Sequence, residues 1–204
     1  MNLIELIIDE ATDMFGVHAL SLVSNPAIQS DFIALGDEKP ILLAEVSPDK
    51  QILMGAVLIP DKPIFRQGSK GQEDYYVFFS EDTVSKTAEM FFKRGNQSNA
   101  TLEHKDVLDG MTVFESWIVE DPEMDKSKKF GLNVPKGTWM VSMKVDDKEI
   151  WDKYVKNDKV FGFSLEGRFA DILVAENVEQ NFSDQIVDNA LENIKQLLIN
   201  HFKE

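Results

Sequence analysis

The chain has 204 residues, which is enough for one domain with a substantial core, and its 43% apolar and 28% charged residues are typical of a globular protein. The formal net charge of −15 disfavours nucleic acid and anionic membranes as partners, because both are usually bound by a basic surface. The sequence has no cysteine, which excludes disulfides and thiolate sites, and no apolar run approaches the roughly 20 residues of a membrane helix.

Alternating apolar residues predict a mainly β chain. Ser80 is predicted to cap a helix that ends near Gly95, and a short helix is expected at 147–156. The polar segment 61–74 is predicted to be a loop. Strands are expected at 2–9, 17–24, 41–47, 51–59, 75–80, 111–120, 138–145 and 159–175.

The end of the chain has a different pattern. From Ser183 to Phe202, apolar residues recur every three or four positions, which predicts a long amphipathic helix. We therefore divide the chain into a β domain at 1–175 and a C-terminal helix at 182–203, which either packs on the domain or mediates assembly. The strands lack βαβ alternation and a glycine-rich phosphate loop, so we predict an α+β chain built on a compact β-barrel with peripheral helices.

Ser164, in the stretch GFSLEG, is a candidate nucleophile. In the predicted strand it lies on the face opposite Phe163 and Leu165, and Gly162 beside it leaves room for a substrate backbone. The glycine spacing does not fit the G-x-S-x-G elbow of α/β-hydrolases. A packing role for this serine is the alternative, and a nucleophilic role requires a base elsewhere in the chain.

The histidines available as a base are His18, His104 and His201. Asp-Gly at 109–110 is a strong hairpin signal, and a two-residue loop there would place Glu115 directly opposite His104. A carboxylate in that position could orient the imidazole. A wider loop would give His104 a different partner. Three dispersed histidines without cysteine predict no metal site, and no cofactor is predicted.

Several segments carry a family resemblance: LMGAVLIPDKPIFR, YYVFFSEDTV, ATLEHKD and GFSLEG. They resemble the phage prohead (procapsid) maturation proteases, in particular the XkdF-like phage serine proteases, over most of the chain. The resemblance implies a β-barrel related to the herpesvirus assemblin protease, with a serine nucleophile and a histidine base. Ser164 and His104 are the matching positions, and we expect their polar atoms within about 4 Å on neighbouring strands.

The same resemblance implies a serine endopeptidase that cleaves phage scaffold and major capsid proteins, and itself. This activity would be located in the host cytoplasm, inside the assembling procapsid, and the protease could form a homodimer or a higher oligomer. An alternative of a different class is a catalytically inactive head-assembly protein on the same fold.

The third member of the site departs from better-known relatives, which carry an acid or a second histidine on a strand after the serine. Glu115 is our first candidate. His18 is the alternative, because a circularly permuted arrangement would place the N-terminal strand beside the serine. Asp171, Glu176 and Asp188 are further candidates.

Overall fold

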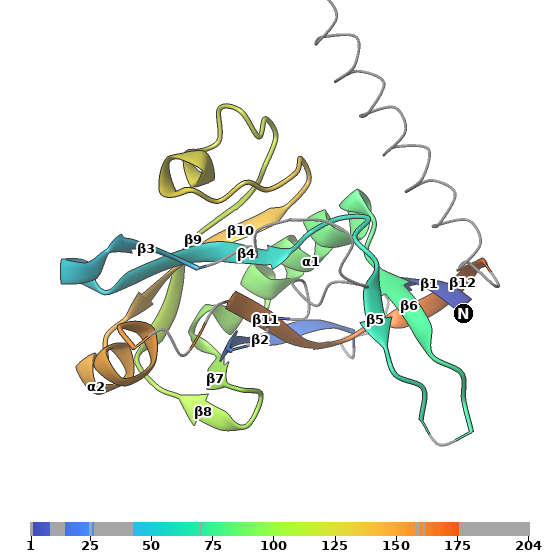
Figure 1. Cartoon of the computed structure of the whole chain (residues 1–204), viewed down its shortest axis with the longest axis horizontal. Coiled ribbons are helices and arrows are strands. Elements are labelled where there is room, and N and C mark those ends of the chain that lie inside the picture. The colour runs from blue at the N-terminus through green and yellow to red at the C-terminus, as the bar shows by residue number, and fades with distance from the viewer. Residues whose placement is uncertain are drawn as a thin grey trace, which may run out of the picture.

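The computed structural model describes residues 2–8, 15–24, 26, 43–69, 71–157, 160 and 162–175. These residues form three four-stranded sheets with strand orders β12-β1-β6-β5, β3-β4-β10-β9 and β11-β2-β7-β8 (Figure 1). The strands are β1 (Asn2–Ile7), β2 (Gly16–Val23), β3 (Ala44–Ser47), β4 (Ile52–Leu58), β5 (Ile64–Arg66), β6 (Tyr75–Phe78), β7 (Ala100–Leu102), β8 (Asp106–Leu108), β9 (Met111–Ile118), β10 (Trp139–Val145), β11 (Gly162–Arg168) and β12 (Ala170–Ala175).

Two short helices are described, α1 (Glu81–Lys93) and α2 (Lys148–Ile150), and a π-helical turn (Trp151–Val155) extends the second. Single 3₁₀ turns occur at Pro48–Lys50, Asn96–Ser98 and Lys126–Phe130. No helix in this described part of the chain is long and apolar enough to cross a membrane. The predicted C-terminal helix at 182–203 lies outside the described residues.

The chain is mainly β, as predicted, but the predicted compact barrel is wrong. None of the three sheets closes into a barrel within the described residues. The single strand expected at 159–175 is divided at Phe169, so that β11 pairs with β2 while β12 pairs with β1 in another sheet. Strands β5, β7 and β8 have only three residues each, which is too short to continue pairing around a barrel.

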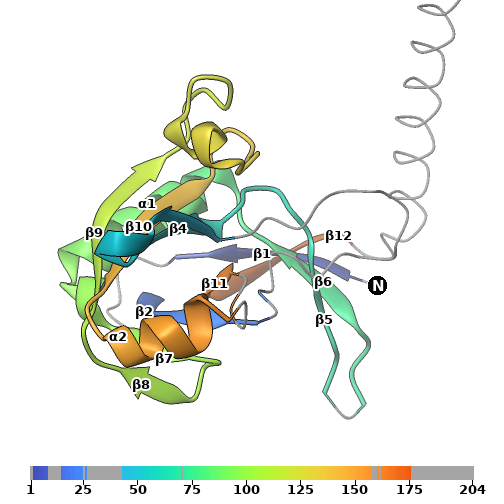
Figure 2. The ribbon, with the colours of Figure 1, turned by 60° about the vertical axis from the view of Figure 1, so that its left-hand side comes forward.

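Two of the sheets form facing layers around the core, with β4, β10 and β9 in one and β11, β2 and β7 in the other (Figure 2). Phe163 of β11 and Leu20 and Leu22 of β2 are fully buried. The ring of Phe163 lies so close to Gly55 of β4 that a Cβ there would come within 3.1 Å of it. Because side chains alternate along a strand, the opposite face of β11 carries Ser164.

Helix α1 confirms the predicted capping signals and fixes the position of β2. The Ser80 hydroxyl accepts the Thr83 N–H, and Gly95 beyond the helix end is left-handed at φ 71°. Directly after the helix, the Asn96 side chain donates to the Val17 carbonyl at 3.0 Å. Asn99 donates to the His18 carbonyl, also at 3.0 Å. These bonds hold β2 next to the segment that continues into β7.

Candidate active site

Ser164 lies on β11, which among the described residues is an edge strand that pairs with β2 alone. The antiparallel register places Ser164 opposite Ser21 and Glu166 opposite Ala19. Ser164 is half-buried. Pro26 packs on the same face beside it, because a Cβ added at Gly162 would come within 2.4 Å of the proline ring. Ser164 therefore lies on the face of β11 opposite Phe163 and Leu165, as the sequence predicted.

His104 lies in a strained turn between β7 and β8. The Lys105 N–H donates to the Leu102 carbonyl at 3.0 Å. The two central residues have positive φ, 51° for Glu103 and 57° for His104, which are the angles of a type I′ turn. Neither is glycine, and each left-handed residue costs about 1–2 kcal/mol. Strain of this kind concentrates at functional sites, where the surrounding structure holds it in place.

Strand β2 supplies the contacts that hold this turn. The Ser21 hydroxyl accepts the His104 N–H at 2.9 Å. The Glu103 N–H donates to the Leu22 carbonyl at 3.0 Å, and the Glu103 carboxylate accepts the Ser24 N–H at 2.7 Å. Both strained residues are thus fixed by the strand that lies between β7 and β11.

Glu166 is the carboxylate next to His104. Its Oε1 lies 3.3 Å from His104 Nδ1 and also accepts a hydrogen bond from the Thr101 hydroxyl. The Glu166 side chain is 21% exposed and the imidazole 42%. A carboxylate at Nδ1 favours the tautomer with the proton on that nitrogen, which leaves Nε2 free to accept a proton. This is the arrangement that orients a general base.

His18 approaches the same carboxylate from a β-bulge. Ala19 opposes Glu166 and Val17 opposes Gly167, so His18 between them has no partner on β11. Its Nε2 lies 3.9 Å from Glu166 Oε2, and its side chain is 64% exposed, which makes the pairing weak. Strand β2, which carries His18, is therefore paired with the strand that carries Ser164. The role of His18 as the third member of the site stays a prediction.

Ser164 and His104 are not on neighbouring strands, because β2 lies between β11 and β7. Among the described residues, no hydrogen bond joins the two side chains. They are related through Ser21, which opposes Ser164 in register and binds the His104 N–H. Directly opposed residues point to the same face of a sheet, so the Ser21 hydroxyl that accepts the His104 N–H lies on the face that carries Ser164.

Glu115 does not pair with His104. Strand β8 pairs with β7 and β9 pairs with β10, so Asp109-Gly110 connects two sheets and the predicted hairpin is not formed. The Glu115 carboxylate forms an ion pair with Lys126 and accepts the Ser142 hydroxyl at 2.5 Å. These two hydrogen bonds, with Lys126 the stronger influence, hold the pKa of Glu115 below its ordinary value.

The remaining candidates lie elsewhere. Asp171, on β12, opposes Leu6 of β1 in the sheet formed by β12, β1, β6 and β5. Glu176, Asp188 and His201 are outside the described residues. No group of three or more metal-ligating side chains suited to a metal ion occurs in the described part of the chain.

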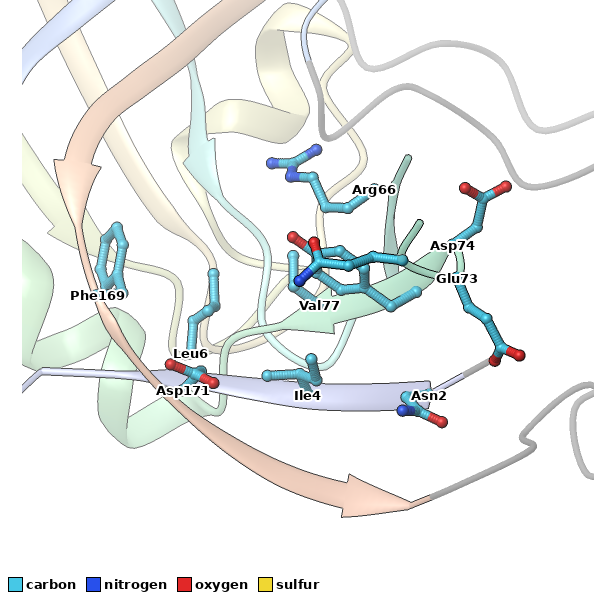
Figure 3. A pocket seen from close by; sticks show the side chains of 11 residues that line it. Asn2, Ile4, Leu6, Arg66, Glu73, Asp74, Val77, Phe169 and Asp171 are labelled. Atoms are coloured by element: carbon cyan, nitrogen blue, oxygen red, sulfur yellow. The ribbon is translucent and has the colours of Figure 1, made fainter. Parts of the chain in front are cut away.

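A cleft of about 620 Å³ lies over the sheet formed by β12, β1, β6 and β5 (Figure 3). Arg66 lines it, and burial lowers the pKa of this guanidinium. Arg66 also lines a cavity of about 40 Å³ together with Ser164, so it borders both spaces. The other cleft residues are Asn2, Ile4, Leu6, Gln72, Glu73, Asp74, Tyr75, Val77, Phe169 and Asp171.

Glu166, Thr101 and Ser21 were not among the site residues predicted from the sequence. Glu166 could have been found from the sequence, because it lies two residues after Ser164 and therefore on the same strand face. Thr101 and Ser21 could not, because their contacts join β2, β7 and β11, which are far apart in the sequence.

The family described as "Putative phage serine protease XkdF" matches residues 40–173, about two thirds of the chain. The match includes His104, Ser164 and Glu166, whereas β2 lies before it. No curated protein and no solved structure matches the chain. The matched region shows that the chain belongs to the XkdF family of phage serine proteases.

Proposed function

We propose that the chain is a serine endopeptidase with Ser164 as nucleophile, His104 as general base and Glu166 as the acid that orients the histidine. The observation that carries this proposal is the 3.3 Å approach of His104 Nδ1, in a strained turn, to Glu166 on the face of β11 that carries Ser164. Glu166 replaces Glu115 in this assignment, because Glu115 lies in a different sheet and is bound to Lys126.

In this mechanism, His104 Nε2 takes the proton of the Ser164 hydroxyl while Oγ attacks the carbonyl carbon of the substrate peptide bond. Glu166 stabilises the imidazolium that forms. The protonated histidine then gives its proton to the leaving amine, and water hydrolyses the acyl-enzyme with His104 again as base. Ser164 and His104 need to approach on substrate binding, as is common for sites that tighten in the substrate complex.

The proposed substrates are phage scaffold and major capsid proteins, and the chain itself, during procapsid assembly in the host cytoplasm. Membership of a phage serine protease family supports this choice. The cleft beside Arg66 offers a place for substrate side chains, since Phe169 at the β11–β12 junction lines it and it shares Arg66 with the cavity that Ser164 lines.

The test is co-expression of the chain with the scaffold and capsid proteins of the same phage, followed by mass spectrometry of the products. We expect defined internal cleavages with the wild-type chain and none with Ser164→Ala or His104→Ala. Ser85→Ala, at an exposed position on α1, is the matched control and should cleave normally. Cleavage at the wild-type rate by Ser164→Ala would remove the proposed nucleophile. Absence of any cleavage by the wild-type chain would favour the inactive head-assembly protein.

A further inference from the structure

We propose that Ser21 is a positioning residue that holds the His104 turn in its strained conformation and so keeps the imidazole against Glu166. The inference rests on the proposed function, since it concerns the histidine assigned there as the base. Ser21 lies on β2, before the region that the family match includes.

Ser21 is fully buried in a strand otherwise made of apolar residues at this point, between Leu20 and Leu22. A buried hydroxyl is unfavourable unless it is hydrogen-bonded. This one accepts the His104 N–H at 2.9 Å and donates to the Thr101 carbonyl at 3.4 Å. Both partners belong to β7 or to the turn that follows it, so the hydroxyl connects β2 to the base.

The turn needs such a contact. Glu103 and His104 are consecutive left-handed residues without the freedom of glycine, and an unconstrained chain would relax to negative φ. That relaxation would rotate the His104 side chain away from Glu166. A displacement of about 1 Å at a reacting group is enough to reduce a rate about 100-fold.

The hydrogen bonds around His104 form a closed ring. Its backbone N–H is bound by Ser21, which donates to the Thr101 carbonyl. The Thr101 hydroxyl binds Glu166, and Glu166 binds the imidazole. Ser21 and Thr101 are also paired in register. Ser21 therefore fixes the backbone of the base, while Thr101 fixes the acid that orients its ring.

The test compares Ser21→Ala with Ser142→Ala. Ser142 is a matched control, because it is also a strand serine, 1% exposed, with a hydrogen-bonded hydroxyl, but it lies in the other layer against Glu115. We expect similar losses of melting temperature in both variants. Only Ser21→Ala should lower kcat, by about 10-fold or more, with KM unchanged because Ser21 does not contact substrate. Only Ser21→Ala should lose hydrogen-exchange protection of the His104 amide.

One further variant makes the result decisive. Thr101→Val removes the other hydroxyl at nearly constant shape, and it should lower kcat while the His104 amide stays protected. Thr101→Val also tests this ring of hydrogen bonds if Ser21→Ala does not fold.

The proposal is overturned if Ser21→Ala keeps both wild-type kcat and a protected His104 amide, or if Ser142→Ala lowers kcat equally. It is also overturned if Thr101→Val leaves kcat unchanged. If the wild-type chain hydrolyses no peptide, the proposed function fails, but the His104 amide exchange still decides whether Ser21 holds the turn.

Discussion

Replacing Glu166 with glutamine tests the proposed acid most directly. The change removes one negative charge and keeps the shape of the side chain. At the 3.3 Å separation from His104 Nδ1, a pair of unit charges interacts by about 1.3 kcal/mol at an effective dielectric constant of 80 and about 5 kcal/mol at 20. Because Glu166 is 21% exposed and His104 42%, we take an intermediate value of about 2.5 kcal/mol. We therefore expect kcat/KM to fall roughly 10²-fold.

The assay is hydrolysis of a fluorogenic peptide that spans a mapped cleavage site, with kcat and KM determined separately. The loss should appear in kcat, because the imidazolium forms during the reaction and not in the free enzyme. Glu115→Gln is the matched control, since it makes the same chemical change in a different sheet. The reasoning is refuted if Glu166→Gln stays within about twofold of wild type, or if Glu115→Gln is the variant that loses activity.

Three further predictions concern stability. Glu115→Gln should make the melting temperature fall less steeply as the pH is lowered into the acid range. The lowered pKa of Glu115 stabilises the fold above the unfolded value of 4.5, and this stability is lost as the pH falls through the folded pKa. An unchanged dependence of melting temperature on pH would contradict this. Asp61→Asn should raise the melting temperature at pH 7 by about 1 °C, and not at pH 3. Burial and the nearby Glu81 and Glu5 raise the pKa of Asp61, so its ionised form is unfavourable in the fold; a lower melting temperature at pH 7 would contradict this. Gly162→Ala should cost about 1–3 kcal/mol in urea unfolding, since its Cβ would meet Pro26 at 2.4 Å, and an unchanged midpoint would show that the proline moves freely.

The elements that the sequence predicted are those with local signals. The α1 helix was predicted from Ser80 to Gly95 because its cap, first-turn acids and C-terminal glycine act within one or two turns. The strands expected at 41–47 and 51–59 are also present, as β3 and β4, and they pair with each other. Strand β5 was predicted as loop, since its three residues, Ile64–Arg66, are too few to show a period.

The Asp109-Gly110 prediction failed because a distant contact determines the path of the chain there. Gly110 has φ 70°, as a turn glycine should, but its carbonyl accepts the Asp146 N–H at 2.7 Å. This bond joins the turn to the end of β10, and β9 continues along β10 instead of returning along β8. A dipeptide signal contains no information about such a partner.

For the candidate site, the sequence predicted the residue types better than their arrangement. Ser164 and His104 were chosen from the sequence, but their expected neighbouring strands are separated by β2. Glu166 could have been found from the period of two along β11. The roles of Ser21 and Thr101 could not, because they depend on the parallel pairing of β2 with β7, about 80 residues apart in the sequence.

The central claim, that Ser164 is the nucleophile and is activated by His104, is tested most directly by reaction with a fluorophosphonate and mapping of the modified residue by mass spectrometry. The account predicts a single adduct on the Ser164 hydroxyl, formed at least tenfold more slowly in Glu166→Gln and absent from Ser164→Ala. An adduct on another serine, or peptide hydrolysis by a chain that never acquires an adduct, would contradict it.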